Sequence, residues 1–307
     1  MNPANYSVIS FPALGISLNP PRGFSVGPLY IHFYGLIIAC GLMLAVYYAC
    51  KRSRQAGLDE DTLLDGVLWV TPFTILCARA YYCAFSWSLY KNNPISVLYI
   101  WEGGLAIYGG VLGAAIGVAL FCKIKKCSLP ALLDLVSLGF LIGQSMGCWG
   151  NFFNREAFGD YTNSLFAMAI PTDYYVGKGT LTGMINSGII TSEMANHMQV
   201  YDGMQWITVH PTFLYESVWN LILLIVIFIY RKHKKFDGEI FLMYLWGYGL
   251  GRVWIEGLRS DSLMLPFFNM KVSQMIAAIC VLACSVLIVK KRMDTVKKQA
   301  PAGKKEQ

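Results

Sequence analysis

The sequence predicts an all-α fold, a polytopic membrane bundle of about seven transmembrane helices, and three observations predict it. Of the 307 residues, 55% are hydrophobic and only 14% are charged, and the mean hydropathy is +0.47. A soluble chain of this length carries roughly a quarter charged residues. The apolar residues gather in runs close to the ~20 residues that a helix needs to cross a bilayer. The basic residues cluster between these runs, as they do in the loops of membrane proteins.

The apolar runs set the order of the expected spans. We expect spans at 28–50, at 63–85, at a segment that is entered through 101–110 and ends near 122, and at 130–146, 210–230, 239–258 and 272–289. Residues 1–27 are mixed in character and predict a short arm outside the membrane. The longest polar insertion, 151–209, predicts a small extracytoplasmic head. We therefore expect one integral membrane domain over 1–290 and a disordered, basic cytoplasmic tail over 291–307.

The distribution of lysine and arginine predicts the orientation. Seventeen of the 25 basic residues lie in the tail and in the loops after the first, third and fifth spans. Six lie on the opposite side, and the remaining two, Arg79 and Arg252, fall inside spans. By the positive-inside rule the tail is cytoplasmic and the N-terminus lies outside the cell membrane. An arginine inside a span is costly in hydrocarbon unless it meets a partner or a polar cavity.

Several function classes are disfavoured by composition. The net charge of +7 is explained by cytoplasmic loops, so we expect no nucleic-acid partner. Most of the nine cysteines lie in or beside apolar runs, where cysteine behaves as a small buried hydrophobe. The sequence has no Cys-x-x-Cys pair, so we do not expect zinc. We expect no other metal and no cofactor. The N-terminus has no basic segment before its first long apolar run, which predicts an anchor and no cleaved signal peptide.

One polar stretch, residues 147–159, interrupts the apolar pattern where the fourth span should end. It reads Gly-Cys-Trp-Gly-Asn-Phe-Phe-Asn-Arg-Glu-Ala-Phe-Gly. Glycines allow the backbone to approach a ligand closely, and Asn and Arg side chains hydrogen-bond phosphate or ester groups. The alternative interpretation is a polar loop that simply leaves a helix.

A second polar pattern lies in the sixth span. Tyr248, Arg252 and Glu256 follow each other at intervals of four, so they share one helix face, and Arg259 follows near the same face. The sharper interpretation is an anion site for a lipid phosphate, because the planar guanidinium fits phosphate. The simpler alternative is an Arg252–Glu256 ion pair at the interface, which would contribute little free energy.

These stretches resemble the prolipoprotein diacylglyceryl transferase family. The family motif reads roughly Gly-Arg-x-Gly-Asn-Phe-x-Asn-x-Glu-x-x-Gly, and this sequence matches it at Gly147, Gly150, Asn151, Phe152, Asn154, Glu156 and Gly159. The resemblance extends from Tyr34 to Arg259. It includes Tyr34-Gly35, Arg79, the paired glycines around Tyr108, His210-Pro211, Leu214-Tyr215-Glu216 and the Tyr-x-x-x-Arg-x-x-x-Glu-x-x-Arg run from Tyr248.

The resemblance implies a reaction and a set of site residues. A diacylglyceryl group would move from phosphatidylglycerol to the thiol of the lipobox cysteine of a prolipoprotein, and glycerol phosphate would leave. The partners would be phosphatidylglycerol, lipobox peptides and membrane lipid. Tyr108, Arg252 and Glu256 are the expected catalytic residues. The expected substrate-binding residues are Tyr34, Arg79, Cys148, Asn151, Asn154, Arg155, Glu156, Gly159, His210, Tyr248 and Arg259. We expect the guanidinium groups to converge with Asn151 and Tyr108.

The roles of Tyr108 and His210 stay open at this point. Tyr108 is a base or proton relay, a positioning hydroxyl, or plain packing, because a tyrosine pKa near 10 suits a base poorly at neutral pH. His210 either binds substrate or hydrogen-bonds locally.

Cys148 is the one departure from the family motif, which has arginine there. Three interpretations follow. Arg155 or Arg79 supplies the missing charge, the protein is a weakened or altered homologue that binds lipid or lipoprotein, or Cys148 is itself a nucleophile. A small-solute transporter is a rival from another class, but the sequence shows no internal repeat of the transporter kind. The acyl-chain and lipoprotein specificity, the general base and the oligomeric state are not predicted.

Overall fold

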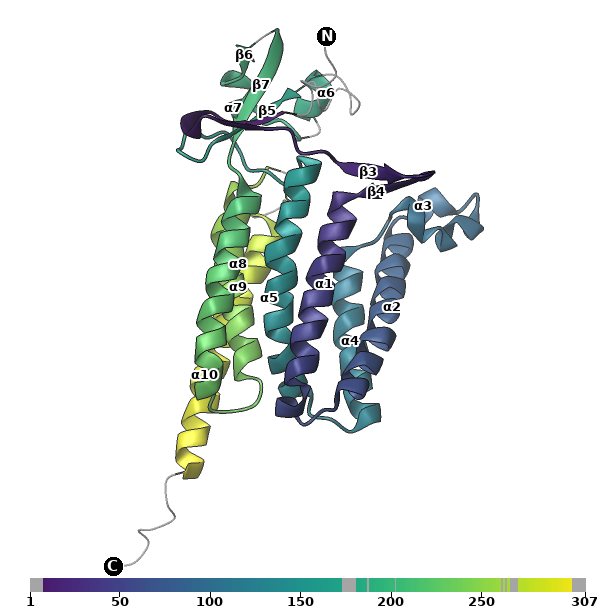
Figure 1. Cartoon of the computed structure of the whole chain (residues 1–307), viewed down its shortest axis with the longest axis vertical. Helices are drawn as coiled ribbons and strands as arrows, with labels where there is room; N and C mark the ends of the chain where they lie inside the picture. Colours follow the sequence, from purple (N-terminus) through teal and green to yellow (C-terminus); the bar gives the residue numbers. More distant parts are fainter. Residues whose placement is uncertain are drawn as a thin grey trace, which may run out of the picture. The chain divides into compact units, whose positions relative to one another are not determined.

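The computed structural model describes residues 8–172, 181–186, 188–201, 203–260, 262, 264–265 and 270–299 (Figure 1). Its long helices are α1 (Phe33–Arg52), α2 (Glu60–Phe85), α4 (Ile107–Lys125), α5 (Leu129–Asn154), α8 (Thr212–Tyr230), α9 (Glu239–Leu258) and α10 (Val272–Gln299). The short helices are α3 (Trp87–Tyr90), α6 (Leu181–Asn186) and α7 (Ser192–Asn196). The strands are β1 (Ile9–Phe11), β2 (Ile16–Leu18), β3 (Gly23–Val26), β4 (Leu29–His32), β5 (Met168–Pro171), β6 (Gln199–Tyr201) and β7 (Met204–Val209).

The predicted polytopic helical fold is confirmed. Six helices of the described residues are long and apolar enough to cross a membrane, namely α1, α2, α4, α5, α8 and α10. The remaining expected span, the sixth along the chain, is α9, which has the predicted bounds but is less apolar, because it carries Glu239, Arg252 and Glu256. It packs against both α8 and α10 (Figure 1). The chain is thus a multi-pass membrane protein in which α9, with its charged residues, packs against two apolar helices.

Two expected span boundaries are wrong. The first helix begins at Phe33, not at 28, because residues 29–32 form β4, which pairs with β3 in an antiparallel hairpin. The fourth helix does not end at 146: α5 continues to Asn154, so the first eight residues of the 147–159 stretch are helical. The chain leaves the helix only at Arg155 and Ala157, both of which have positive φ.

The described structure separates into two compact units where the sequence predicts one domain. The first unit comprises Met1–Leu44 and Phe140–Gln307, and the second comprises Ala45–Gly139. The first unit therefore holds the head, the end of α5, and helices α8, α9 and α10. The second holds α2, α3 and α4.

The head of the first unit is built on a five-stranded antiparallel sheet with the strand order β2-β1-β5-β7-β6. Its core contains Ile9, Ile170, Ile190, Met194 and Ile207, all fully buried. The core continues into the end of α5 through Cys148 and Phe152 and into the start of α8 through Phe213. The sheet thus combines β5, β6 and β7 of the polar insertion with β1 and β2 of the N-terminal arm.

The second unit is held together by close packing of α4 against α2. Gly109, Gly113 and Gly117 are buried and lie one turn apart along α4. A Cβ atom at Gly113 would lie 2.5 Å from Cys77 Cβ, and one at Gly117 would lie 3.0 Å from the Phe73 ring. The small-residue spacing therefore serves helix packing, which is its usual role in membranes.

The start of the expected disordered tail is helical. Helix α10 continues to Gln299, and residues 300–307 lie outside the described residues. Contacts with α8 and α9 hold this part of the helix: Arg292 Nε donates to Glu239 Oε1 at 2.7 Å, and Arg292 Nη2 donates to the Tyr230 hydroxyl at 2.7 Å. A buried carboxylate with a basic partner thus extends the helix beyond its apolar run.

Candidate functional site

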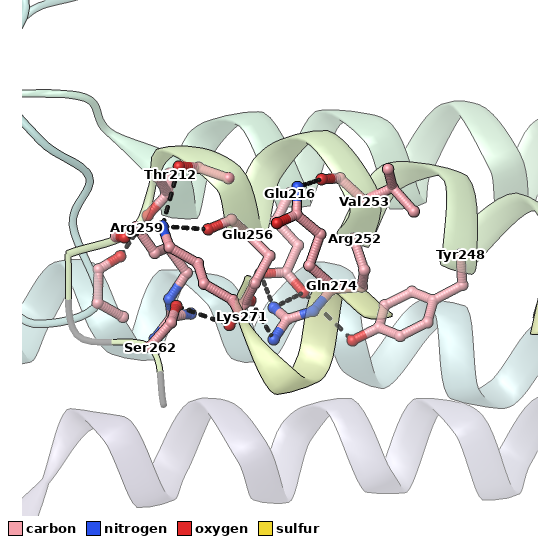
Figure 2. A network of polar contacts seen from close by, with 12 residues as sticks. Thr212, Glu216, Tyr248, Arg252, Val253, Glu256, Arg259, Ser262, Lys271 and Gln274 are labelled. Atoms are coloured by element: carbon pink, nitrogen blue, oxygen red, sulfur yellow. Dashed lines mark hydrogen bonds and ion pairs between the residues drawn. The ribbon is translucent and has the colours of Figure 1, made fainter. Parts of the chain in front are cut away.

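The site is centred on Arg252, which lies in α9 between two carboxylates (Figure 2). Arg252 Nη2 lies 2.7 Å from Glu256 Oε2, one turn further along α9. Arg252 Nη1 lies 3.3 Å from Glu216 Oε2 and 3.4 Å from Oε1, and Glu216 belongs to α8. The Tyr248 hydroxyl donates to Glu216 Oε1 at 3.4 Å. The predicted face of Tyr248, Arg252 and Glu256 is therefore real, and it is completed by a carboxylate from the neighbouring helix.

All three charged side chains of this cluster are largely buried. The side chain of Arg252 is 21% exposed, that of Glu216 12% and that of Glu256 only 4%. Charges in such surroundings interact more strongly than they do in water. This burial disfavours our simpler alternative, in which Arg252 and Glu256 form an ion pair at the membrane interface that contributes little free energy.

The end of α9 is fixed by contacts that hold Glu256 in place. Ser262 Oγ donates to Glu256 Oε1 at 2.7 Å. Lys271 Nζ donates to the carbonyl oxygens of Glu256 at 2.8 Å and Gly257 at 2.9 Å, and also to that of Arg259. The last carbonyls of a helix have no partner within the helix, and a cation near them is stabilising. Figure 2 shows Ser262 and Lys271 beside this turn.

Cys148 of α5 faces the same cluster. Its side chain is buried and lies within electrostatic range of Glu216, Arg252 and Arg259. An arginine at this position would thus add a guanidinium beside Glu216. In this chain the second guanidinium near Cys148 belongs to Arg259.

The end of the 147–159 stretch joins the two helices that carry the site. Gly159 N donates to His210 O at 2.9 Å, and Gly159 forms an isolated bridge with Arg259. A Cβ atom at Gly159 would lie 2.7 Å from His210 Cβ and 2.8 Å from Leu258 O, so only glycine fits there. The match of Gly159 to the family motif thus has a packing explanation.

Gly150 and Tyr34 form a second close contact within the first unit. A Cβ atom at Gly150 would lie 2.5 Å from the Tyr34 ring, so the ring of α1 lies directly on the α5 backbone. Asn151 follows next and lies three residues after Cys148, on the same side of α5. Asn154 Nδ2 donates to Glu156 Oε1 at 3.0 Å, so these two residues pair with each other where the helix ends.

Arg155 and Arg79 are engaged by the backbone, which disfavours both as substitutes for the missing arginine. Arg155 is 1% exposed, and it donates to Phe153 O at 2.9 Å and to Pro20 O at 2.8 Å. It therefore ties the N-terminal arm to the end of α5.

Arg79 is 5% exposed and lies in the second unit. Its guanidinium donates to the carbonyl oxygens of Ser96, Val97, Tyr99, Gly103 and Gly104 at 2.5–3.3 Å. These contacts explain how an arginine is accommodated in a span, and they give it a structural role.

Tyr108 and His210 lie near the starts of helices. Tyr108 belongs to the first turn of α4 in the second unit and is 43% exposed, so it is not plain core packing. His210 precedes α8, and its Nδ1 lies 3.3 Å from the Tyr215 hydroxyl. Burial lowers the pKa of His210, and the nearby charge of Asp160 opposes this effect. These contacts favour local hydrogen bonding, the second of the two interpretations of His210.

Sequence reasoning missed the role of Glu216. The residue was visible as part of the 210–216 match, but it was not assigned to the site. The signal that could have found it is a lone carboxylate inside the apolar run of the fifth span, since such residues face a partner or a polar cavity.

The arrangement thus places a largely buried guanidinium between two carboxylates, at the end of the helices that carries the head. Comparison with known proteins assigns the chain to a family. The family model described as prolipoprotein diacylglyceryl transferase matches residues 21–290, and the chain belongs to this family.

Curated relatives cover nearly the same length. A protein of Bacillus licheniformis is 38% identical over 272 residues, which is 89% of this chain and 92% of the relative. A protein of Limosilactobacillus reuteri is 37% identical over 278 residues, covering 90% and 92%. One of Clostridium novyi is 39% identical over 270 residues, covering 88% and 95%. All three are named phosphatidylglycerol–prolipoprotein diacylglyceryl transferase.

Proposed function

We propose that this protein transfers the diacylglyceryl group of phosphatidylglycerol to the lipobox cysteine thiol of prolipoproteins, the first step of bacterial lipoprotein maturation. The observation that carries the proposal is the buried Arg252 between Glu216 and Glu256, which suits a lipid phosphate. The names of the relatives, at 37–39% identity over most of both chains, support the substrates. We place the protein in the cell membrane with its head and site outside and its C-terminus in the cytoplasm, because of the lysine and arginine count.

The reaction requires one bond to form and one to break. The sulfur of the lipobox cysteine attacks the glyceryl carbon that bears the phosphate, so a C–S bond forms and a C–O bond breaks. The electron pair of the broken bond leaves with glycerol phosphate. Arg252 neutralises the charge that grows on this leaving group, in a site where a guanidinium is worth more than in water.

Glu256 positions Arg252 in this proposal. It holds Nη2 at 2.7 Å and is itself held by Ser262. Because Glu256 orients the guanidinium from one side, the other side of the guanidinium can bind phosphate. The contacts of Arg252 with Glu216, at 3.3 and 3.4 Å, are the longer ones and the easier to exchange.

Glu216 is then the proton acceptor that we favour for the incoming thiol. When phosphate takes its place on Arg252, the Glu216 carboxylate loses its cation partner and is free to accept a proton. The thiol proton passes to Glu216 and then to an oxygen of the leaving phosphate, so the step balances. Tyr108 remains our sequence-based candidate for a relay or positioning hydroxyl. Asn151 and Asn154 remain proposed contributors to the lipid side of the site, whereas the backbone contacts of Arg155 disfavour such a role.

The test is a transfer assay with purified protein in vesicles that contain phosphatidylglycerol, with a lipobox peptide as acceptor. Wild type should attach diacylglycerol to the peptide thiol and release glycerol phosphate. The R252K variant keeps the charge and loses the planar fork, so we expect its rate to fall about 10²-fold or more. R292A is the control, because it breaks the 2.7 Å contact between Arg292 and the buried Glu239 of the same unit, far along α9 from Arg252.

Complementation separates this proposal from its rivals. Expression in a strain depleted of the transferase should restore lipoprotein lipidation. A transporter, or a homologue that only binds lipid or lipoprotein, would leave lipidation absent.

A further inference from the structure

A layer of polar side chains lies between α5 and α8, and four of its buried atoms have no hydrogen-bond partner within the described residues. The atoms are Gln144 Oε1, Ser145 Oγ and both amide atoms of Asn220, Oδ1 and Nδ2. Asn220 is 0% exposed. A buried polar group without a partner costs about 1–3 kcal/mol, so these positions would be more stable with apolar residues. The polar groups therefore point to a ligand.

Contacts within the first unit place this layer directly beneath the Arg252 cluster. Asn220 lies four residues after Glu216 and three after Ser217, so all three share a face of α8. Ser217 Oγ donates to Ser145 O at 2.9 Å, which brings this face against α5.

The same depth is reached along α9. Gln144 Nε2 donates to the Tyr244 hydroxyl at 3.0 Å, and the Tyr244 ring stacks on that of Tyr248, one turn nearer the head. The Tyr248 hydroxyl in turn donates to Glu216. The layer of Gln144, Ser145 and Asn220 is therefore one helical turn, about 6 Å, further from the head than the Glu216–Arg252 pair.

We propose that this layer binds an ester carbonyl of the diacylglyceryl group. The inference rests on the proposed function, with the lipid phosphate at Arg252. In a glycerophospholipid the ester carbonyls lie a few bonds from the phosphorus, a reach of about 6 Å with ordinary bond lengths. This reach matches one helical turn. An ester carbonyl only accepts hydrogen bonds, and Asn220 Nδ2 and Ser145 Oγ both carry donors.

The layer would thus bind the ester-linked glycerol backbone of the lipid while Arg252 binds its phosphate. The two contacts together fix the glyceryl carbon between them, which is the carbon that the thiol attacks. The specificity that follows is for diester lipids over diether lipids, because an ether has no carbonyl to accept the hydrogen bond.

The experiment compares diester and diether phosphatidylglycerol of equal chain length as donors in the vesicle assay. Wild type should use the diester with kcat/KM about 5- to 10-fold higher, the contribution expected of one hydrogen bond. N220L should lower the diester value to that of the diether and leave the diether value unchanged. Because both lipids are measured on one preparation, a partial loss of folded protein cancels in the ratio.

Two further variants complete the test. S285A removes a polar contact between α9 and α10, the 3.0 Å bond from Trp246 Nε1, and should leave the diester-to-diether ratio as in wild type. S145A tests a second residue of the layer if N220L does not reach the membrane, and it should also lower the diester-to-diether ratio of kcat/KM.

Three results would overturn the inference. The first is equal use of the two lipids by wild type. The second is an equal loss of activity on both lipids in N220L and S145A, which a buried water or a packing role would give. The third is a diester-to-diether ratio of kcat/KM that is unchanged in both variants. Equal use of both lipids by an active wild type would leave the proposed function standing. An absence of transfer from either lipid would overturn both.

Discussion

Arg79 and Arg252 are both buried arginines in membrane-spanning helices, but their guanidinium groups meet different partners. Arg79 donates to five backbone carbonyl oxygens of the 96–104 segment, which are fixed once the second unit has folded. Arg252 contacts two side-chain carboxylates, one at 2.7 Å and one at 3.3–3.4 Å. The first arrangement leaves the guanidinium committed to the fold. The second holds the guanidinium through side chains, and we propose that the lipid phosphate replaces one of them.

Arg155 belongs with Arg79 in this comparison. Its contacts are with Phe153 O and Pro20 O, and its φ is positive. The partners separate the three arginines: backbone carbonyl oxygens hold Arg79 and Arg155, whereas side-chain carboxylates hold Arg252. Sequence alone does not state this difference, because both kinds of arginine look equally costly in hydrocarbon.

The largest expected effects come from exchanging each arginine for lysine. R252K should lose about 10²-fold or more in transfer rate with little change in unfolding temperature, because the charge remains but the fork is lost. R79K should do the reverse. Lysine satisfies fewer carbonyls, so the unfolding temperature should fall by about 5 °C or more, while the rate per folded molecule is retained.

Thermal unfolding and transfer rates measured on the same preparations check both halves. The comparison fails if R79K keeps the wild-type unfolding temperature and loses activity. It also fails if R252K has a lowered unfolding temperature and keeps the wild-type transfer rate.

Glu216 and Glu256 offer the next contrast, because both carboxylates contact one guanidinium. E216Q should lose about 10²-fold in kcat at neutral pH, the usual contribution of a general base. The loss should shrink as pH rises past about 8.5, where the acceptor thiol ionises unaided. E256Q should raise KM for the lipid and show no such recovery. Rate profiles between pH 6 and 9.5 distinguish the two, and a profile for E216Q parallel to that of wild type would remove Glu216 as the proton acceptor.

The substitutions at Cys148 should have smaller effects. C148A should keep the transfer rate within about 3-fold of wild type. The Cys148 thiol lies within electrostatic range of the cluster, but the nucleophile of the proposed reaction is the thiol of the lipobox cysteine. C148R should keep or raise the rate, since an arginine there should help to hold the lipid phosphate. Transfer assays on both variants check this, and a complete loss in C148A would show that the thiol is needed.

The sequence predicted the fold and the polar face of the sixth span well, because hydropathy and helical periodicity are local properties. Residues 239–258 had the observed bounds, and Tyr248, Arg252 and Glu256 do share a face. It did less well where tertiary contacts decide. The pairing of β1 with β5 and the contact of Glu216 with Arg252 join segments far apart in the chain. The extension of α5 to Asn154 runs through a glycine- and asparagine-rich stretch that predicted a helix end. The expected convergence of Asn151 and Tyr108 on Arg252 stays a prediction.

The smallest expected effect concerns His210, which lies outside the spans. Its lowered pKa means that the folded state binds fewer protons than the unfolded state, whose histidine titrates near 6.5. Stability should therefore be complete above about pH 6.5 and fall as pH drops below it. H210Q should reduce the decline in unfolding temperature between pH 7.5 and 5.5 by about 1–3 °C. Both proteins keep Asp160 and Tyr215, the groups that face the ring, so an identical decline would show that His210 does not cause it.

The central claim is that Arg252 binds the phosphate of the donor lipid. The most direct measurement is the affinity of wild type and R252K for phosphatidylglycerol and for uncharged diacylglycerol, in bilayers of otherwise neutral lipid. The account predicts that R252K weakens phosphatidylglycerol binding by about 10-fold, the loss of a bidentate contact, and leaves diacylglycerol binding unchanged. Equal affinity of the two proteins for phosphatidylglycerol would contradict it.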